Sequence, residues 1–198
     1  MNAGWTRGDS EGQRVTAELV ERAQRGDHEA FERLATAAYH RLYAVARRIL
    51  RDGYAAEDAV QDTLLKAWRE IRGLRDPEKF DAWLHRLLVN ACRDQVRRRN
   101  RRPLEVDIPN LERAAPGDDM ARLVDRDEIE HAFLELSVEH RAVLVLTHYL
   151  GLSGPEVAAI LRIPPGTVHS RLHYGSQAMR AALSRPPMLS TTAPEPGR

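Results

Sequence analysis

Side chains able to bind charged or polar partners gather in three separate stretches of this 198-residue sequence. The first stretch holds Glu57, Asp58 and Asp62, which could form a magnesium site or an acidic docking face. The second, over positions 93–102, contains six arginines and one aspartate, and guanidinium groups neutralise phosphates. The third, after position 166, mixes hydroxyl, imidazole and guanidinium groups that can contact the edges of bases. These residue types predict a nucleic-acid-binding protein.

Catalytic and metal-binding patterns do not accompany these stretches. His169 and His173 are four residues apart, but the acidic residue of a zinc-protease helix is not between them. The eight histidines form no convincing ligand set with carboxylates or with Cys92. A glycine-rich phosphate loop and a nucleophile elbow are also absent from the sequence. We therefore expect no enzymatic activity, no metal site and no cofactor.

Helices must position the three stretches, because apolar residues recur at helical spacing and strand patterns are nearly absent. One helix is expected to begin after an N-cap at Asp27, and two more to cover about residues 55–71 and 78–99. Phe80 and Trp83 could stack on bases. They share the apolar face of the third helix, so we assign both to the core.

Changes in composition divide the chain. Polar, glycine-rich residues 1–15 predict a disordered leader before a first helical domain over residues 16–100. Residues 101–125 contain three prolines and many carboxylates, which predicts a flexible acidic linker. A second helical domain over residues 126–184 precedes a Pro-, Ser- and Thr-rich tail at 185–198, expected to be disordered. The predicted fold class is all-α, with two small helical domains.

The expected compartment follows from the cysteine count and from hydropathy. Cys92 is the only cysteine, so neither a disulfide nor a cysteine-based metal site can form within the chain, as suits a reducing cytosol. The N-terminus has no apolar core of signal-peptide length, and no run approaches the ~18 apolar residues of a membrane span. These features predict a cytoplasmic protein without direct membrane insertion.

The second helical domain contains the pattern of a helix-turn-helix between residues 153 and 183. Ser153 and Glu156 have the spacing of a capping box, a Pro-Pro-Gly turn follows, and a second helix is expected to begin at Thr167. An ordinary helical hairpin has the same periodicity, but the compact cap, turn and Thr-Val-x-Ser-Arg sequence favours DNA binding. The residues expected to face DNA are Thr167, His169, Ser170, Arg171, His173 and Tyr174.

Two sets of motifs resemble the extracytoplasmic-function (ECF) subfamily of the sigma-70 family of bacterial RNA polymerase sigma factors. Residues 56–68, AEDAVQDTLLKAW, are similar to the family's core-polymerase-binding helix. Phe80-x-x-Trp83-Leu84, with Asn90 and the arginine run that follows, resembles its promoter-melting helix. Residues 163–172, IPPGTVHSRL, resemble its C-terminal promoter-binding domain. The motifs occur in the family's order.

The resemblance implies a non-catalytic polymerase subunit that recognises −10 and −35 promoter elements, aids DNA melting and directs initiation. It implies that one polar stripe of the second helix docks on core polymerase: Asp58, Gln61, Asp62 and Leu65. The residues implied to act at the −10 element are Arg75, Lys79, Arg86, Asn90, Arg93, Arg97 and Arg98. The helix-turn-helix residues given above would contact the −35 element. The implied partners are core RNA polymerase, promoter DNA and an anti-sigma factor.

Several alternatives remain open. Tyr174, Gly175 and Ser176 stand where many relatives carry basic residues, which predicts weak DNA binding by the C-terminal domain alone. The acidic linker suits threading through the polymerase's basic channels, as the resemblance implies, or a plain solubilising tether. The rival functions are a stand-alone helix-turn-helix regulator and a helical nuclease or phosphotransfer enzyme using the acidic cluster. The basic third helix and the docking stripe favour the sigma factor, since a simple regulator needs neither.

Overall fold

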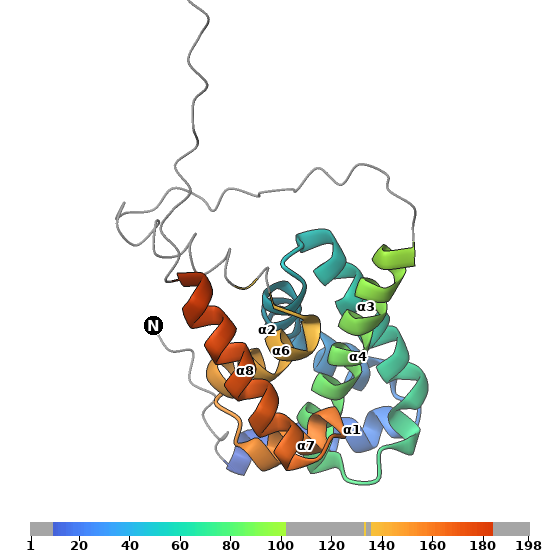
Figure 1. Ribbon diagram of the computed structural model, residues 1–198. Helices are drawn as coiled ribbons and strands as arrows, with labels where there is room; N and C mark the ends of the chain where they lie inside the picture. Colours follow the sequence, from blue (N-terminus) through green and yellow to red (C-terminus); the bar gives the residue numbers. More distant parts are fainter. Residues whose placement is uncertain (1–9, 102–132, 134–135, 184–198) are drawn as a thin grey trace, which may run out of the picture.

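The described part of the chain, residues 10–101, 133 and 136–183 of a computed structural model, is built from helices and contains no strand (Figure 1). This confirms the all-α prediction. The α-helices are α1 (Ser10–Gln24), α2 (His28–Leu50), α3 (Gly53–Glu70), α4 (Phe80–Arg101), α6 (Val138–Leu144), α7 (Gly154–Leu161) and α8 (Pro165–Leu183). Two 3-10 turns, Ile71–Gly73 and Pro77–Lys79, connect α3 to α4, and a π-helical turn, Val145–Tyr149, continues α6.

Capping residues set the ends of α2 and α3. The Asp27 carboxylate accepts a hydrogen bond from the backbone N of Ala30 at 3.0 Å, so the predicted N-cap of α2 is confirmed. That bond holds the pKa of Asp27 below its usual value, because it favours the charged form. At the other end Arg51 adopts φ 62°, and Asp52 then caps α3 through the backbone N of Ala55 at 3.0 Å. This two-residue turn folds α3 back onto α2.

Helices α1 to α4 form one unit, which we call the N-terminal block. Its core consists of the apolar faces of α2, α3 and α4 together with Val20 and Ala23 of α1. Phe80 and Trp83 are buried there, with rings 5.9 Å apart, so their assignment to the core is confirmed. Gln24 links α1 to the segment between α3 and α4, because its side-chain amide donates a hydrogen bond to the carbonyl of Leu74 at 2.7 Å.

Helices α6 to α8 form the C-terminal block, in which short helices meet at tight turns. The Glu156 carboxylate accepts hydrogen bonds from the backbone N and hydroxyl of Ser153 at 2.8 and 2.6 Å, which confirms the predicted capping box. Arg162 ends α7 in the left-handed conformation, φ 52°, and α8 begins at Pro165. Helix α8 therefore starts two residues before the expected Thr167, since Pro is well accommodated in a first helical turn.

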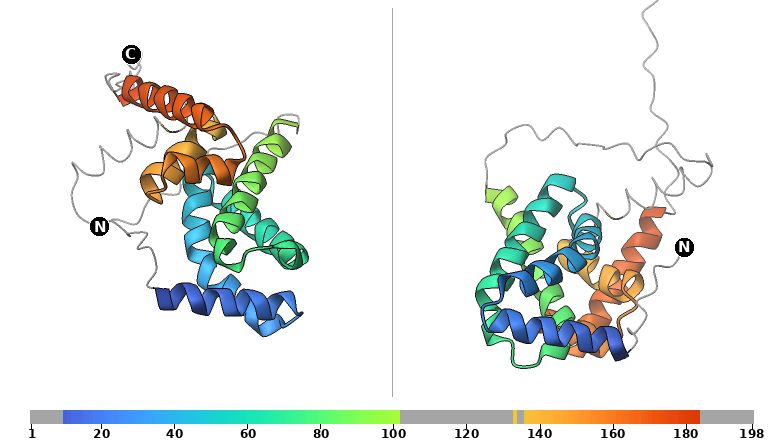
Figure 2. Two further views of the ribbon diagram at one scale, coloured as in Figure 1. Left: turned by 90° about the horizontal axis from the view of Figure 1, so that it is seen from below. Right: turned by 180° about the vertical axis from the view of Figure 1, so that it is seen from behind.

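The two blocks pack against each other. Helix α4 contacts α6 and α7, and α2 contacts α6 and the π-helical turn. Figure 2 (left) shows the C-terminal block, in orange and red, on the side of α2 and α4 that lies away from α1. The guanidinium of Arg48 in α2 stacks 3.8 Å from the ring centroid of Tyr149 across this contact. The buried apolar side chains of both blocks form one continuous cluster.

One predicted boundary is wrong. Residues 10–15 were expected in a disordered leader, but α1 begins at Ser10. Composition favoured a loop because Gly12 and polar side chains dominate there, whereas helical hydrogen bonding extends outward from the packed turns around Val20. The expectations for residues 1–9, for the linker and the start of the second domain over 102–132, and for the tail at 185–198 fall outside the described residues.

Candidate nucleic-acid and protein interface

The predicted docking stripe lies on the outer face of α3. Asp58, Gln61 and Leu65 are exposed, and Leu65 retains 56% of its accessible surface, which is high for a leucine. Asp62 is different, because its carboxylate forms an ion pair with Arg98 of α4 at 3.2 Å. The structure thus places three of the four residues free on one face and the fourth at the edge toward α4.

The polar face of α4 presents arginines around one amide. Arg93 donates to the side-chain oxygen of Asn90, and Arg97 to that of Asp94, both at 3.4 Å. Asn90 and Arg97 are exposed, whereas Arg93 is half-buried. These interactions are long and solvent-accessible, so a phosphate can replace them at little cost. This face can bind a nucleic-acid backbone and offer an amide to a base.

The loop before α4 adds exposed positive charge beside that face. Lys79 forms an ion pair with Asp76 at 2.8 Å, and its pKa is raised by this hydrogen bond and by the charge of Asp76. Asp76 also caps the 3-10 turn by accepting from the backbone N of Glu78 at 3.1 Å. Arg75 is exposed on the same loop. Asp76 therefore fixes the loop and orients Lys79 at the start of α4.

The first turns of α8 carry the other predicted DNA contacts. His169, His173 and Tyr174 are exposed, and the last two rings meet edge to face at 5.5 Å. Ser170 donates from its hydroxyl to the carbonyl of Thr167 at 3.1 Å, which leaves its lone pairs available. Arg171 is half-buried, and its Nη1 has no hydrogen-bond partner. The exposed set is mostly neutral and suits contacts with base edges more than phosphate neutralisation.

Arginines of the two blocks approach one another where the blocks meet. Burial lowers the pKa of the half-buried Arg93; Glu139 of α6 opposes this shift, and Arg171 of α8 adds to it. Burial and then the charge of Arg51 in the α2–α3 turn lower the pKa of Arg141 in α6. The two predicted DNA-contacting helices, α4 and α8, thus turn one arginine each toward the same contact region.

His85 is a buried polar residue that the sequence did not single out. Its Nδ1 lies 2.8 Å from the carbonyl oxygen of Asp81, and its Nε2 has no partner. Burial, and next the positive charge of Arg41, lower the pKa of His85 to about 4. The imidazole is therefore neutral near pH 7 and acts as part of the core.

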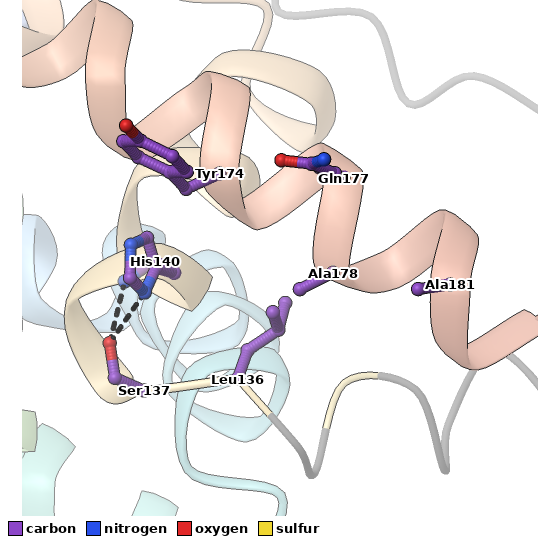
Figure 3. A pocket seen from close by; sticks show the side chains of 7 residues that line it. All are labelled: Leu136, Ser137, His140, Tyr174, Gln177, Ala178 and Ala181. Atoms are coloured by element: carbon purple, nitrogen blue, oxygen red, sulfur yellow. Dashed lines mark hydrogen bonds between the residues drawn. The ribbon is translucent and has the colours of Figure 1, made fainter.

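A hollow of about 590 Å³ opens between α6 and α8 (Figure 3). Ser137 and His140 lie on its wall with Oγ and Nδ1 2.8 Å apart, a distance that could suggest a nucleophile and its base. Ser137 is instead the N-cap of α6, since its oxygen accepts from the backbone N of His140. The remaining wall residues are Leu136, Tyr174, Gln177, Ala178 and Ala181, and they provide no carboxylate to orient the imidazole.

Metal binding and membrane insertion find no support in the described ranges. Within residues 10–101 and 136–183, no three His, Cys, Asp or Glu side chains are placed to hold a metal ion. The same holds for Glu57, Asp58 and Asp62, the candidate magnesium ligands, which are not placed together to hold an ion. None of the helices in these same ranges is both long and apolar enough to cross a membrane.

Comparison with known proteins agrees with this arrangement. Residues 34–102 match Sigma-70 region 2, and residues 126–179 match Sigma-70 region 4. The chain is 32% identical to the RNA polymerase sigma-H factor of Pseudomonas aeruginosa over 178 residues, covering 84% of this chain and 92% of that protein. It is 33% identical to the ECF RNA polymerase sigma factor SigM of Mycobacterium tuberculosis, covering 80% of each.

Solved structures show the same fold. CnrH in complex with the cytosolic domain of CnrY superposes with a TM-score of 0.63 at 27% identity, covering 85% of this chain and 97% of that one. The sigma factor RpoE of Bartonella quintana, in complex with the anti-sigma factor NepR, superposes with a TM-score of 0.62 at 28% identity, covering 77% of this chain and 96% of that one. The matched regions, the relatives and the fold agree, and the chain belongs to the ECF subfamily of sigma-70 RNA polymerase sigma factors.

Proposed function

This sigma factor directs RNA polymerase to promoters for initiation, and we propose that its two blocks bind different partners and different promoter elements. The N-terminal block, corresponding to region 2, binds core polymerase through α3 and the −10 element through α4. The C-terminal block, corresponding to region 4, contacts the −35 element through α8. The observation that carries this assignment is the separation of an acidic, partly apolar face on α3 from an arginine face on α4.

The α3 face is suited to a basic helical surface of polymerase. Asp58 supplies negative charge, Gln61 supplies an amide, and the exposed Leu65 supplies apolar area that gains from burial. Asp62 contributes at the edge of this face, where its ion pair with Arg98 links the polymerase-binding and DNA-binding helices. A basic partner residue that captured Asp62 would release Arg98 for a phosphate, so docking would favour DNA binding.

The packed arrangement of the blocks differs from the one needed on a promoter. Positions −10 and −35 are about 25 base pairs apart, or roughly 85 Å of B-form DNA. Arg93 and Arg171 instead lie within electrostatic range of each other. The 36 residues between Arg101 of α4 and Val138 of α6 can reach up to about 120 Å when extended. The blocks must therefore separate before both elements are bound, with the connecting chain long enough to permit it.

Further assignments follow from this function. The protein is a specificity subunit without catalysis of its own, and it acts in the cytoplasm, where core polymerase and promoter DNA are found. An anti-sigma factor regulates it, by analogy with the sigma factor RpoE of Bartonella quintana, whose solved structure is a complex with the anti-sigma factor NepR. Such a protein would compete with polymerase for exposed faces of one or both blocks.

The experiment that tests the proposal is run-off transcription with purified chain and core polymerase on a genomic template library. Discrete transcripts that need the chain are expected, and their absence from every template would favour a stand-alone regulator. In a direct binding titration with core polymerase, Gln61→Arg, which places a positive charge in the α3 face, should lower core affinity roughly 100-fold. Gln61→Arg is preferred to Asp62→Arg because it leaves the Asp62–Arg98 pair intact. Unchanged core binding would remove α3 as the docking helix.

A further inference from the structure

Tyr54 is the most exposed large hydrophobic side chain of the described residues, with 69% of its surface accessible. It lies in the first turn of α3, where Asp52 already caps the helix. The ring makes no aromatic, cation–π or hydrogen-bonding contact with the described part of the chain. Neither the fold nor the helix start accounts for a tyrosine here, so the side chain is available for a partner.

Tyr54 and the exposed Leu65 lie on the same line along α3. They are 11 residues apart, which is about three helical turns, and they differ by roughly 20° around the axis. Asp58 and Gln61 fall between them, within about 40° of Tyr54 on either side. The four side chains form a narrow strip about 16 Å long, with an apolar group at each end and polar groups in the middle. We call this strip the Tyr54–Leu65 strip.

Such a strip has the properties of a protein-binding surface. Apolar anchors that flank a polar centre bury area at both ends and fix the register of a helical partner. Tyrosine is favoured at such positions because it brings a large contact area with few rotatable bonds, and its hydroxyl tolerates solvent before binding. The carboxylate between the anchors selects a partner with basic residues in its centre.

We propose that Tyr54 is an additional anchor residue for core polymerase, which extends the docking face of α3 by one turn toward the helix start. The inference rests on the proposed function, because the strip is continuous with Asp58, Gln61 and Leu65. The matching surface on polymerase is a basic helix with two apolar contact points about 16 Å apart. Tyr54 is buried against one point and Leu65 against the other.

The test is the affinity of the full-length chain for core polymerase, measured by fluorescence anisotropy with a label on the N-terminus. Tyr54→Ala is expected to weaken binding roughly 10- to 50-fold, the effect of truncating an aromatic anchor. Tyr54→Phe keeps the ring and should stay within about 3-fold of the wild type. Lys66→Ala is the matched control, because Lys66 is exposed on α3 but lies about 120° around the axis from Tyr54 and about 80° from Asp58, the nearest member of the strip by angle.

The outcomes separate this proposal from the proposed function. Equal affinities for Tyr54→Ala and Lys66→Ala, with Gln61→Arg still defective, would overturn the anchor role but keep α3 as the docking helix. Normal binding by Gln61→Arg as well would remove the docking helix itself. A loss with both Tyr54→Ala and Tyr54→Phe would assign the effect to the hydroxyl and contradict an apolar anchor. Far-UV circular dichroism of each variant checks that the helices are intact.

Discussion

The helices that we propose as the DNA contacts of the two blocks carry opposite kinds of side chain. Helix α4 spans 22 residues and carries Arg86, Arg93, Arg97 and Arg98 along or beside its polar face. The first half of α8 offers hydroxyl, imidazole and phenol groups around the single Arg171. Guanidinium groups attract phosphates of any sequence, while neutral groups depend on being placed against particular base edges. Under the proposed function, we therefore expect the N-terminal block to supply most of the DNA affinity and the C-terminal block to depend on polymerase for its position.

The blocks also differ in how they are held together. The N-terminal block has long helices over a thick apolar core that encloses even the imidazole of His85. The C-terminal block has helices of seven and eight residues beside α8, and a small residue of α8 lies where side chains of α6 come close. Gly175 is the clearest case, since a Cβ built on it would lie 3.3 Å from Leu144 Cδ1. We therefore expect the stability of this block to depend more on the volume of its packed side chains than on their charge.

The largest expected effect comes from reversing charge on α4. Arg93→Glu combined with Arg97→Glu should reduce promoter opening between roughly 100- and 1000-fold, because two phosphate contacts become repulsive. Arg171→Glu in α8 should cost only about 10-fold. The measurement is the fluorescence of 2-aminopurine at the −10 element with saturating polymerase, so that core binding does not limit it. Equal losses from both helices would contradict the proposed difference between the blocks.

The next effect concerns the core of the N-terminal block at low pH. Unfolded histidine binds a proton below about pH 6.5, whereas His85 in the folded chain binds one only near pH 4. The unfolded state therefore holds more protons between these values, and stability is lost as pH falls through them. From pH 7.5 to pH 5 this group should cost about 2 kcal/mol.

Urea unfolding of the wild type and of His85→Leu, at both pH values, measures the contribution of His85 to the free energy of unfolding. The variant has no imidazole to protonate, so its stability should fall by about 2 kcal/mol less than that of the wild type over the same interval. The comparison uses the difference between the two pH values, which removes any constant loss of packing or of the bond to Asp81. Parallel pH profiles for the two proteins would show that His85 is not kept neutral by burial.

Features encoded by neighbouring residues could be predicted from the sequence. The N-cap at Asp27 and the box of Ser153 and Glu156 need only a three-residue spacing, and both are confirmed. The burial of Phe80 and Trp83 follows from helical periodicity. These interactions are local, so one helix contains all the information they require.

Features that join distant segments could not be predicted. The ion pair between Asp62 and Arg98 crosses from α3 to α4, and the sequence gives no sign that one docking residue is already engaged. The approach of Arg93 to Arg171 depends on how two blocks pack. Glycine lowers the stability of a helix, and only the packing of α6, about 30 residues earlier in the chain, explains why the small Gly175 stands in α8. Each of these depends on tertiary contacts that periodicity does not encode.

A smaller effect is expected from filling the space at Gly175. Gly175→Leu should destabilise the chain by about 1.5 kcal/mol, because overpacking against Leu144 and His140 outweighs the gain in helix propensity. Gly175→Ala should be nearly neutral, since its Cβ would be tight only against the movable Cδ1 of Leu144, at 3.3 Å, and would meet His140 Cβ at an ordinary contact distance of 3.4 Å. Gly166→Ala is the matched control in the same helix, because nothing lies within 4 Å of its added Cβ. Thermal unfolding measures all three, and a stabilised Gly175→Leu would show that α8 does not lie this close to α6.

The smallest effect concerns the contact between the blocks. Arg48→Ala removes the cation–π interaction with Tyr149 and should raise the population of separated blocks about 2- to 5-fold. Energy transfer between dyes at Glu32→Cys and Ala181→Cys, in a Cys92→Ala background, reports this separation. Arg33→Ala is the control, because it is also an exposed arginine of α2 but lies about 22 Å along the helix from Arg48.

Salt gives the same contact an independent test. Arg51 with Arg141, Arg93 with Arg171 and Arg86 with Arg162 bring positive charges of opposite blocks together, against the attraction of Arg93 to Glu139, and ions screen the net repulsion. Raising the salt concentration should therefore increase energy transfer in the free chain, whereas formation of a promoter complex should decrease it. If salt instead separated the blocks, attraction between opposite charges would have to dominate their contact. The arginines proposed to bind DNA in the open state would then also stabilise the closed one, and the two states would compete for the same side chains.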